Sequence, residues 1–223
     1  MIIYYCIILT ETIKVMNSID GQLICFNFKF VNHPGILFDP NLCDNHERFL
    51  NSEFVESYIQ DSYELSLFMR NRERWETSWD EVPSKEQAID YFGKQVAFFE
   101  TTFNNIKKEK LFASGPTILY RGVTTDRYKV IDDIIIDPGI ISTSWDPNIA
   151  LEFTSKSNDA IVLKYLLPPN SPMFALKSST MEKEVLLPAN SSFKILSRKI
   201  VTYKNILNND IFYTATIVTL QPC

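Results

Sequence analysis

Apolar and polar residues follow two different spacings along the chain, a helical spacing in the first half and a strand spacing in the second. Between residues 47 and about 70, Leu50, Phe54 and Tyr58 fall on one stripe of a helix, with Val55 beside them. The pattern predicts helical structure over this part of the chain.

A longer helix is predicted after residue 84. Ser84 and Gln87 have the spacing of a capping box, in which each side chain bonds to the backbone of the other residue. Lysines crowd the far end, where the helix dipole favours positive charge. The apolar positions recur at alternating steps of three and four, which indicates one face packed on a core: Ile89, Phe92, Val96, Phe99, Phe103 and Ile106.

From residue 117 onward, short apolar runs separated by turn residues are typical of strands. Strands are predicted at residues 117–123, 139–144, 160–167, 174–176, 184–187, 193–196 and 212–220. Because helices precede strands, the sequence favours an α+β class with a largely antiparallel sheet.

Residues 1 to about 45 are predicted to be an N-terminal extension, and residues 46–223 the main domain. Ile2–Leu9 and Leu23–Val31 look like strands, and Asp20-Gly21 is a turn signal between them. The two runs predict either a hairpin or a segment that precedes the domain proper.

The composition is that of a globular protein with one domain, or one domain and an appendix. The chain has 223 residues, of which 45% are hydrophobic and 22% charged, and its net charge is −5. Nucleic-acid binding needs a basic surface, so we expect no nucleic acid as partner.

Metal-ligating residues are few and scattered. The chain has four cysteines, none of which forms a close-spaced metal pair with another, and only two histidines, so we expect no metal and free thiols in a reducing compartment. Residues 1–9 are apolar, but they lack the basic start and cleavage site of a signal peptide and are too short to span a bilayer. We therefore expect no membrane span, and an intracellular or delivered protein rather than a classically secreted one.

Two glutamates flank a lysine at the start of a predicted strand. Residues two apart share a strand face, so Glu182 and Glu184 point the same way and Lys183 points opposite. Adjacent carboxylates repel, which makes a functional pair one interpretation. A solvated strand end is the ordinary alternative.

Two polar motifs lie upstream of the glutamates. Arg121 lies between Tyr120 and Gly122, where an arginine fork can hold phosphate and a glycine lets a ligand approach the backbone. Ser142 and Ser144 share one face of their predicted strand. Taken singly, these residues are better explained by a strand salt bridge and by surface hydroxyls.

Three motifs occur along the chain in this order: Tyr120-Arg121-Gly122, then Gly139 to Ser144, then Glu182 to Pro188. Through them the chain resembles arginine–serine–glutamate mono-ADP-ribosyltransferases, in particular the bacterial exoenzyme and binary-toxin branch. The resemblance implies N-terminal helices packed on a mainly antiparallel β core of two sheets. It also implies that residues 46–223 are the catalytic domain.

The resemblance further implies NAD as substrate. Arg121 would bind the NAD phosphates, the backbone at Gly122 would hold the nicotinamide amide, and Phe153 would stack on nicotinamide. Lys156 would replace an arginine that this family often places on phosphate.

For the chemistry, the resemblance implies that Ser142 orients Glu184, that Glu184 stabilises the ribosyl cation, and that Glu182 prepares the acceptor side chain. The physics agrees, because cleaving the bond between nicotinamide and ribose gives an oxocarbenium-like transition state that a nearby carboxylate stabilises. The leaving group is already cationic, so no general acid is required.

The chain departs from the family in the loop at residues 177–181, which has no aromatic residue to recognise a target, and in having glycine after Arg121 where some toxins carry a second arginine. The activity expected is mono-ADP-ribosylation of an unidentified target protein, on arginine. An NAD glycohydrolase and a catalytically silent interaction module are the alternatives.

Overall fold

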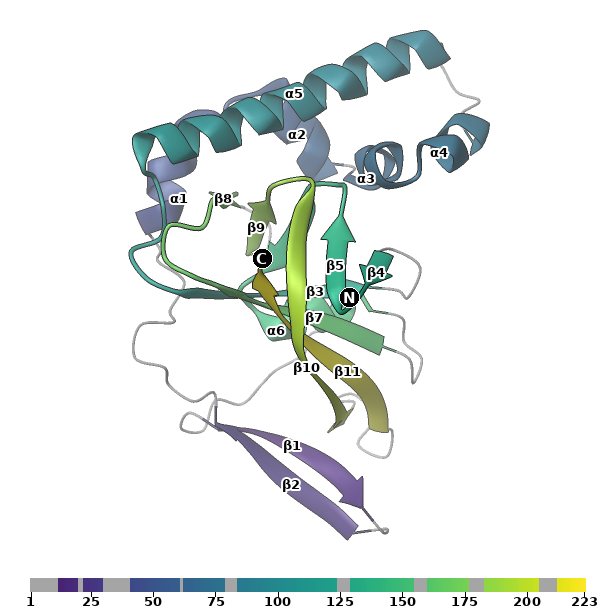
Figure 1. Ribbon diagram of the computed structural model, residues 1–223, viewed down its shortest axis with the longest axis vertical. Helices are drawn as coiled ribbons and strands as arrows, with labels where there is room; N and C mark the ends of the chain where they lie inside the picture. The colour runs from purple at the N-terminus through teal and green to yellow at the C-terminus, as the bar shows by residue number, and fades with distance from the viewer. Residues whose placement is uncertain are drawn as a thin grey trace.

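The fold comes from a computed structural model, which places a layer of helices over a large sheet (Figure 1). The model describes residues 12–19, 22–29, 41–60, 62–78, 84–123, 129–154, 160–176, 183–204 and 212–223.

The helices predicted before residue 110 are present, although the first stretch is divided. The long helix after Ser84 is confirmed with its capping box, and Lys110 ends it in the left-handed conformation at φ 58°. The helical elements are α1 (Asn41–His46), the 3₁₀ turn η1 (Glu47–Phe49), α2 (Glu53–Gln60), α3 (Ser62–Arg70), α4 (Arg72–Ser78), α5 (Lys85–Glu109) and α6 (Pro147–Glu152).

Nine of the described strands form one sheet in the order β4-β5-β10-β11-β7-β3-β6-β9-β8. Neighbours are antiparallel except β11 and β7, so the predicted α+β class and mainly antiparallel pairing are confirmed. These strands are β3 (Thr117–Val123), β4 (Lys129–Ile131), β5 (Ile134–Asp137), β6 (Ile141–Ser144), β7 (Ala160–Leu167), β8 (Phe174–Ala175), β9 (Glu184–Leu187), β10 (Ser191–Lys204) and β11 (Phe212–Pro222).

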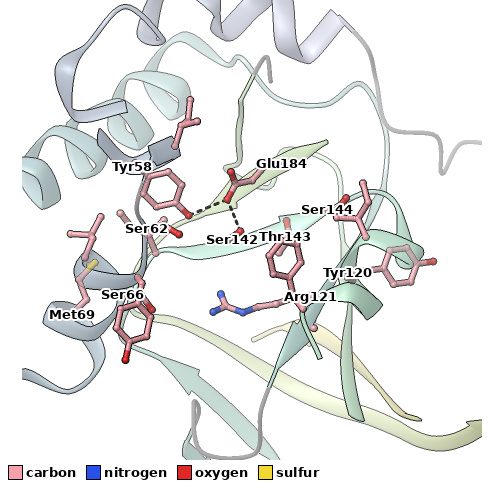
Figure 2. Close-up of a pocket in the computed structure, with 18 of the residues that line it drawn as sticks. Tyr58, Ser62, Ser66, Met69, Tyr120, Arg121, Ser142, Thr143, Ser144 and Glu184 are labelled. Carbon is pink, nitrogen blue, oxygen red and sulfur yellow. Dashed lines mark hydrogen bonds between the residues drawn. The ribbon is translucent and has the colours of Figure 1, made fainter. Parts of the chain in front are cut away.

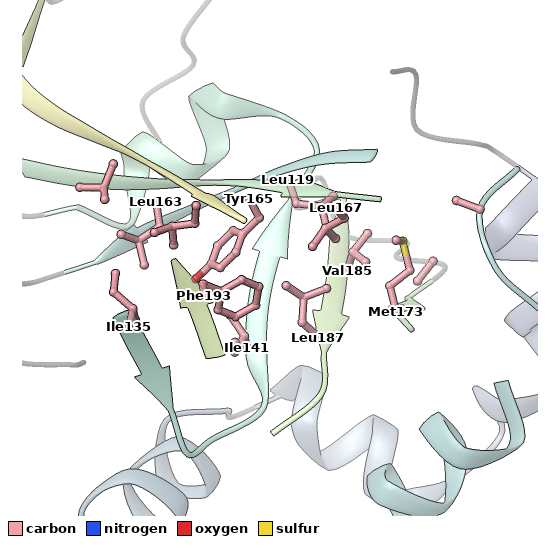
Figure 3. Packing of buried hydrophobic residues seen from close by; sticks show 14 of the residues in the cluster. Leu119, Ile135, Ile141, Leu163, Tyr165, Leu167, Met173, Val185, Leu187 and Phe193 are labelled. Carbon is pink, nitrogen blue, oxygen red and sulfur yellow. The ribbon is translucent and has the colours of Figure 1, made fainter. Parts of the chain in front are cut away.

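The two predicted sheets are joined into one through a single residue pair, Tyr120 of β3 opposite Ser144 of β6. Figure 3 shows the strands that carry Ile141 and Leu187 crossing the direction of β3 and β7, with the core side chains between the two halves. The sheet therefore bends between β3 and β6, and the bend brings the middle of β3 and the start of β9 to the same side of the sheet.

A second core fixes the helices on the sheet. Phe99 of α5 is fully buried and contacts the Phe174 ring of β8, with 6.4 Å between ring centroids. Leu186 of β9 belongs to the same apolar cluster. The predicted apolar face of α5 therefore packs on a core, as expected, and shares that core with β8 and β9.

The N-terminal part contains a separate antiparallel hairpin of β1 (Thr12–Ile19) and β2 (Gln22–Lys29). The strand predicted at Ile2–Leu9 lies outside the described residues. Helix α1 spans the predicted boundary at residue 45, and its Leu42 is buried in the sheet core. The division of the chain into an extension and a catalytic domain stays a prediction.

Strand β1 and the β4–β5 hairpin were not predicted. Strands β4 and β5 pair through a turn at Asp132 and Asp133, which have φ values of 49° and 61°. Aspartate is among the few residues other than glycine that adopt this left-handed conformation readily. Strand β5 ends at Asp137.

Candidate active site

A cleft of about 430 Å³ opens between helices α2 and α3 on one side and β3, β6, β9 and α6 on the other. Arg121, Ser142 and Glu184 all line it, although they come from three different strands (Figure 2). Figure 2 shows the Arg121 side chain extending toward the helix that carries Ser62 and Ser66, while Glu184 and Ser142 face each other across the neighbouring strands.

Glu184 is buried to 9% exposure at the first position of β9. The Ser142 hydroxyl donates a hydrogen bond of 2.5 Å to Glu184 Oε1. The register makes this possible, because β6 and β9 pair antiparallel and place Ser144 opposite Glu184, with Ser142 one step further along the same face. The predicted contact between the serine and the glutamate is therefore present.

Tyr58 is a third member of this hydrogen-bonded group. It was not predicted as a site residue from the sequence. Its hydroxyl donates a hydrogen bond of 3.1 Å to the same oxygen, Glu184 Oε1. Burial raises the pKa of Tyr58 well above its usual value, and the Glu184 carboxylate raises it further, so the hydroxyl stays a donor. An aromatic residue on an apolar helical stripe indicates only a core position, and its ring does pack against Phe99 at 5.4 Å.

Arg121 lies in the cleft floor with 10% of its side chain exposed. Its Nη1 atom is 4.0 Å from Asp137 Oδ2, and within the described part of the chain this buried nitrogen has no hydrogen-bond partner. The sequence reasoning missed Asp137, and it also missed Arg70, whose Nε donates to Asp137 Oδ1 over 2.8 Å. No local pattern pairs these residues, which are 67 positions apart.

Gly122 allows helix α6 to pack directly on β3. A Cβ atom at this position would lie 1.9 Å from the Ala150 carbonyl oxygen. This close approach is a structural reason for glycine that holds whether or not a ligand also contacts the backbone there.

The remaining predicted site residues are only partly placed. Phe153 lines the cleft just after α6 and is 58% exposed. Lys156 and Glu182 lie outside the described residues. Lys183, which follows Glu182, has a φ of 49° and its Nζ atom lies 2.9 Å from Asp146 Oδ2, so the strand entry is tied to the start of α6.

Among the residues that the structure describes, no three His, Cys, Asp or Glu side chains gather in a group that could hold a metal ion. Nor does any described helix combine the length and apolar character that crossing a membrane requires.

No protein-family model and no curated protein matches the sequence. Solved structures do match. The enzymatic component C2-I of the C2 toxin from Clostridium botulinum has a TM-score of 0.57 and 15% identity, over 94% of this chain and 54% of C2-I. The ADP-ribosylating toxin BECa of C. perfringens, solved with NADH, has a TM-score of 0.56 and 16% identity, over 94% of this chain and 55% of BECa.

A shorter protein, the ADP-ribosyltransferase toxin Plx2a from Paenibacillus larvae, matches over 81% of this chain and 92% of its own, with a TM-score of 0.53 and 11% identity. The chain therefore has the fold of ADP-ribosyltransferase toxins, as the motifs predicted, and spans about half the length of C2-I. Identities this low show the fold alone.

Proposed function

We propose that this chain is an NAD-dependent mono-ADP-ribosyltransferase that transfers ADP-ribose from NAD to a protein side chain, arginine, and releases nicotinamide. The observation that carries the proposal is a buried glutamate with two hydroxyl donors on one oxygen, in the same cleft as a buried arginine whose Nη1 has no hydrogen-bond partner among the described residues. The proteins that share this fold include ADP-ribosyltransferase toxins, and BECa among them was solved with NADH.

We assign the binding of NAD to the guanidinium of Arg121 in the cleft floor. A guanidinium binds phosphate through charge-assisted hydrogen bonds, in a fork that matches the phosphate oxygens. Arg121 is the residue we assign to the diphosphate. Phe153, exposed at the rim, offers a ring face on which nicotinamide can stack.

Cleavage breaks the bond between ribose C1′ and the nicotinamide nitrogen, and the bonding electrons leave with nicotinamide, which becomes neutral. Positive charge develops on the ribose, and a fixed carboxylate stabilises it without reorganising at the moment of reaction. Ser142 and Tyr58 hold Glu184 in that orientation.

Transfer forms a bond between C1′ and an arginine nitrogen of the target. Arginine is protonated at neutral pH and a poor nucleophile, so a carboxylate must orient it and accept a proton. We assign this role to Glu182, because it precedes Glu184 by two positions in the sequence. If water takes the place of arginine, the same cleft gives an NAD glycohydrolase.

The test is to incubate the purified chain with NAD and measure nicotinamide release, with and without agmatine as an arginine mimic. Transfer predicts labelled agmatine and faster nicotinamide release when agmatine is present. Release without any labelling would leave only the glycohydrolase, and no release under either condition would contradict the proposal.

A matched variant separates the two glutamates. Glu182→Gln should keep nicotinamide release and lose agmatine labelling, since only the acceptor needs that carboxylate. Agmatine labelling at the wild-type rate in this variant would contradict arginine as the acceptor.

A further inference from the structure

A buried cluster of charges lies in the wall of the cleft, where Arg70 of α3 and Arg121 of β3 meet Asp137 of β5. Arg70, the last residue of α3, binds the Asp137 carboxylate with two nitrogens, Nε at 2.8 Å from Oδ1 and Nη2 at 3.1 Å from Oδ2. Arg121 approaches the same carboxylate from β3, with Nη1 at 4.0 Å from Oδ2. Two guanidinium groups thus share one carboxylate, and the cluster carries a net positive charge.

The two arginines differ in how fully the protein pairs their hydrogen-bond donors. Arg70 makes four hydrogen bonds, two to Asp137, one to the Ser66 hydroxyl at 2.6 Å and one to the Ile140 carbonyl at 2.6 Å. A guanidinium has five donors, so Arg70 is nearly saturated by the protein. Nη1 of Arg121 is buried and has no hydrogen-bond partner within the described residues.

The backbone next to Asp137 also holds its carboxylate in place. The backbone N–H of Gly139 donates to Asp137 Oδ1 at 3.0 Å. A Cβ atom on Gly139 would lie 2.6 Å from Arg70 Cζ, so the guanidinium occupies space that glycine leaves open. The carboxylate is 8% exposed on the side-chain scale, which strengthens its pull on a neighbouring cation.

We infer that Asp137 is a positioning residue for Arg121, and that Arg70 serves to hold Asp137 in place. This inference rests on the proposed function, since it assigns Asp137 to the NAD-binding step. Asp137 attracts Nη1 and so sets the orientation in which the rest of the Arg121 guanidinium meets the diphosphate of NAD. A preset fork loses less freedom on binding, which favours affinity.

If Asp137 positions Arg121, replacing Asp137 changes NAD affinity in the direction opposite to the one that electrostatics alone predicts. Asp137→Asn removes a negative charge close to an anion site, so electrostatics alone would tighten NAD binding. If Asp137 positions Arg121, the same variant weakens NAD binding, by about tenfold or more. In an Arg121→Ala background, Asp137→Asn should then have no further effect on the dissociation constant, because the residue it positions is gone.

The experiment is calorimetric titration of the full chain with NAD for the wild type, Asp137→Asn, Arg121→Ala and the double variant. Asp133→Asn is the matched control, because it removes the same charge from an exposed turn of the same hairpin and should leave NAD affinity unchanged. If Asp137→Asn unfolds, Arg70→Lys serves instead, since it keeps the charge and loses the two-point grip on Asp137.

Weakened binding in the single variant, with no further loss in the double variant, is the expected result. Unchanged or tighter binding in Asp137→Asn, or an equal loss in the Arg121→Ala background, would overturn the inference and leave the proposed function standing. A wild-type chain that binds no NAD would instead overturn the proposed function, and the inference with it.

Discussion

Glu184 receives hydrogen bonds from residues 126 and 42 positions away along the chain, and both arrive at one oxygen. The donors come from different layers, Tyr58 from the helices and Ser142 from the sheet. Both layers must therefore be correctly packed before the carboxylate is held. At the scale of single residues, the site depends on this double restraint.

The Tyr58 hydroxyl can be removed without changing the shape of the core. We expect Tyr58→Phe to lower the rate of nicotinamide release about tenfold or more while NAD affinity stays the same, because a hydrogen bond to a charged group contributes about 1.5–3 kcal/mol. Steady-state kinetics with a direct binding measurement separates the two effects.

Tyr165→Phe removes the same hydroxyl from another buried tyrosine, in the sheet core and away from the cleft. This control should leave the rate of nicotinamide release unchanged. A wild-type rate in Tyr58→Phe would show that the bond to Glu184 is dispensable.

At the scale of elements, the position of α6 on β3 depends on Gly122. We expect Gly122→Ala to lower the free energy of unfolding by about 1–3 kcal/mol, because the new methyl group meets the Ala150 carbonyl and the backbone must shift. Chemical denaturation measures the change.

Gly93 offers the opposite case on the exposed side of α5, where a Cβ atom would meet nothing within 4 Å. Gly93→Ala should stabilise the chain by about 0.5–1 kcal/mol, since alanine favours a helix over glycine. Equal effects of the two variants would contradict the close packing of α6.

His46 connects three segments and should make stability depend on pH. The fully buried ring accepts the Ala175 N–H at Nδ1 over 3.1 Å, and its Nε2 lies 3.0 Å from the Leu111 carbonyl. This arrangement needs the neutral ring, and burial lowers the pKa of His46 below 6.5. Its contribution to stability is therefore complete above pH 6.5 and is lost as pH falls through the lower folded-state pKa.

Denaturation curves between pH 8 and pH 5, about the range over which histidines titrate, test this dependence. The variant His46→Gln should lose this part of the slope of unfolding free energy against pH. An identical slope in the variant and the wild type would show that His46 does not carry the effect.

Elements with a strong local pattern were predictable, and pairings across the chain were not. Helix α5 and the strands bearing Arg121 and Ser142 follow from spacing, caps and apolar runs. The Arg70–Asp137 pair and the Tyr58 bond to Glu184 depend on how the layers meet, which no local periodicity encodes. The β4–β5 hairpin was missed because its turn uses two aspartates rather than glycine.

At the scale of the whole molecule, an acidic chain places a net positive cluster at the floor of its cleft. The overall charge is −5, whereas Arg70 and Arg121 outnumber Asp137 there. This contrast favours a small anionic ligand inside the cleft over a polyanion on the surface.

The most direct measurement is nicotinamide release from NAD by the wild type and by Glu184→Gln, with NAD binding followed on the same samples. We expect steady release by the wild type, and loss of release in Glu184→Gln with binding retained, since the variant keeps the shape of the carboxylate and loses its charge. Release at the wild-type rate in Glu184→Gln would contradict the assignment of the carboxylate and, with it, the enzyme class proposed for this chain.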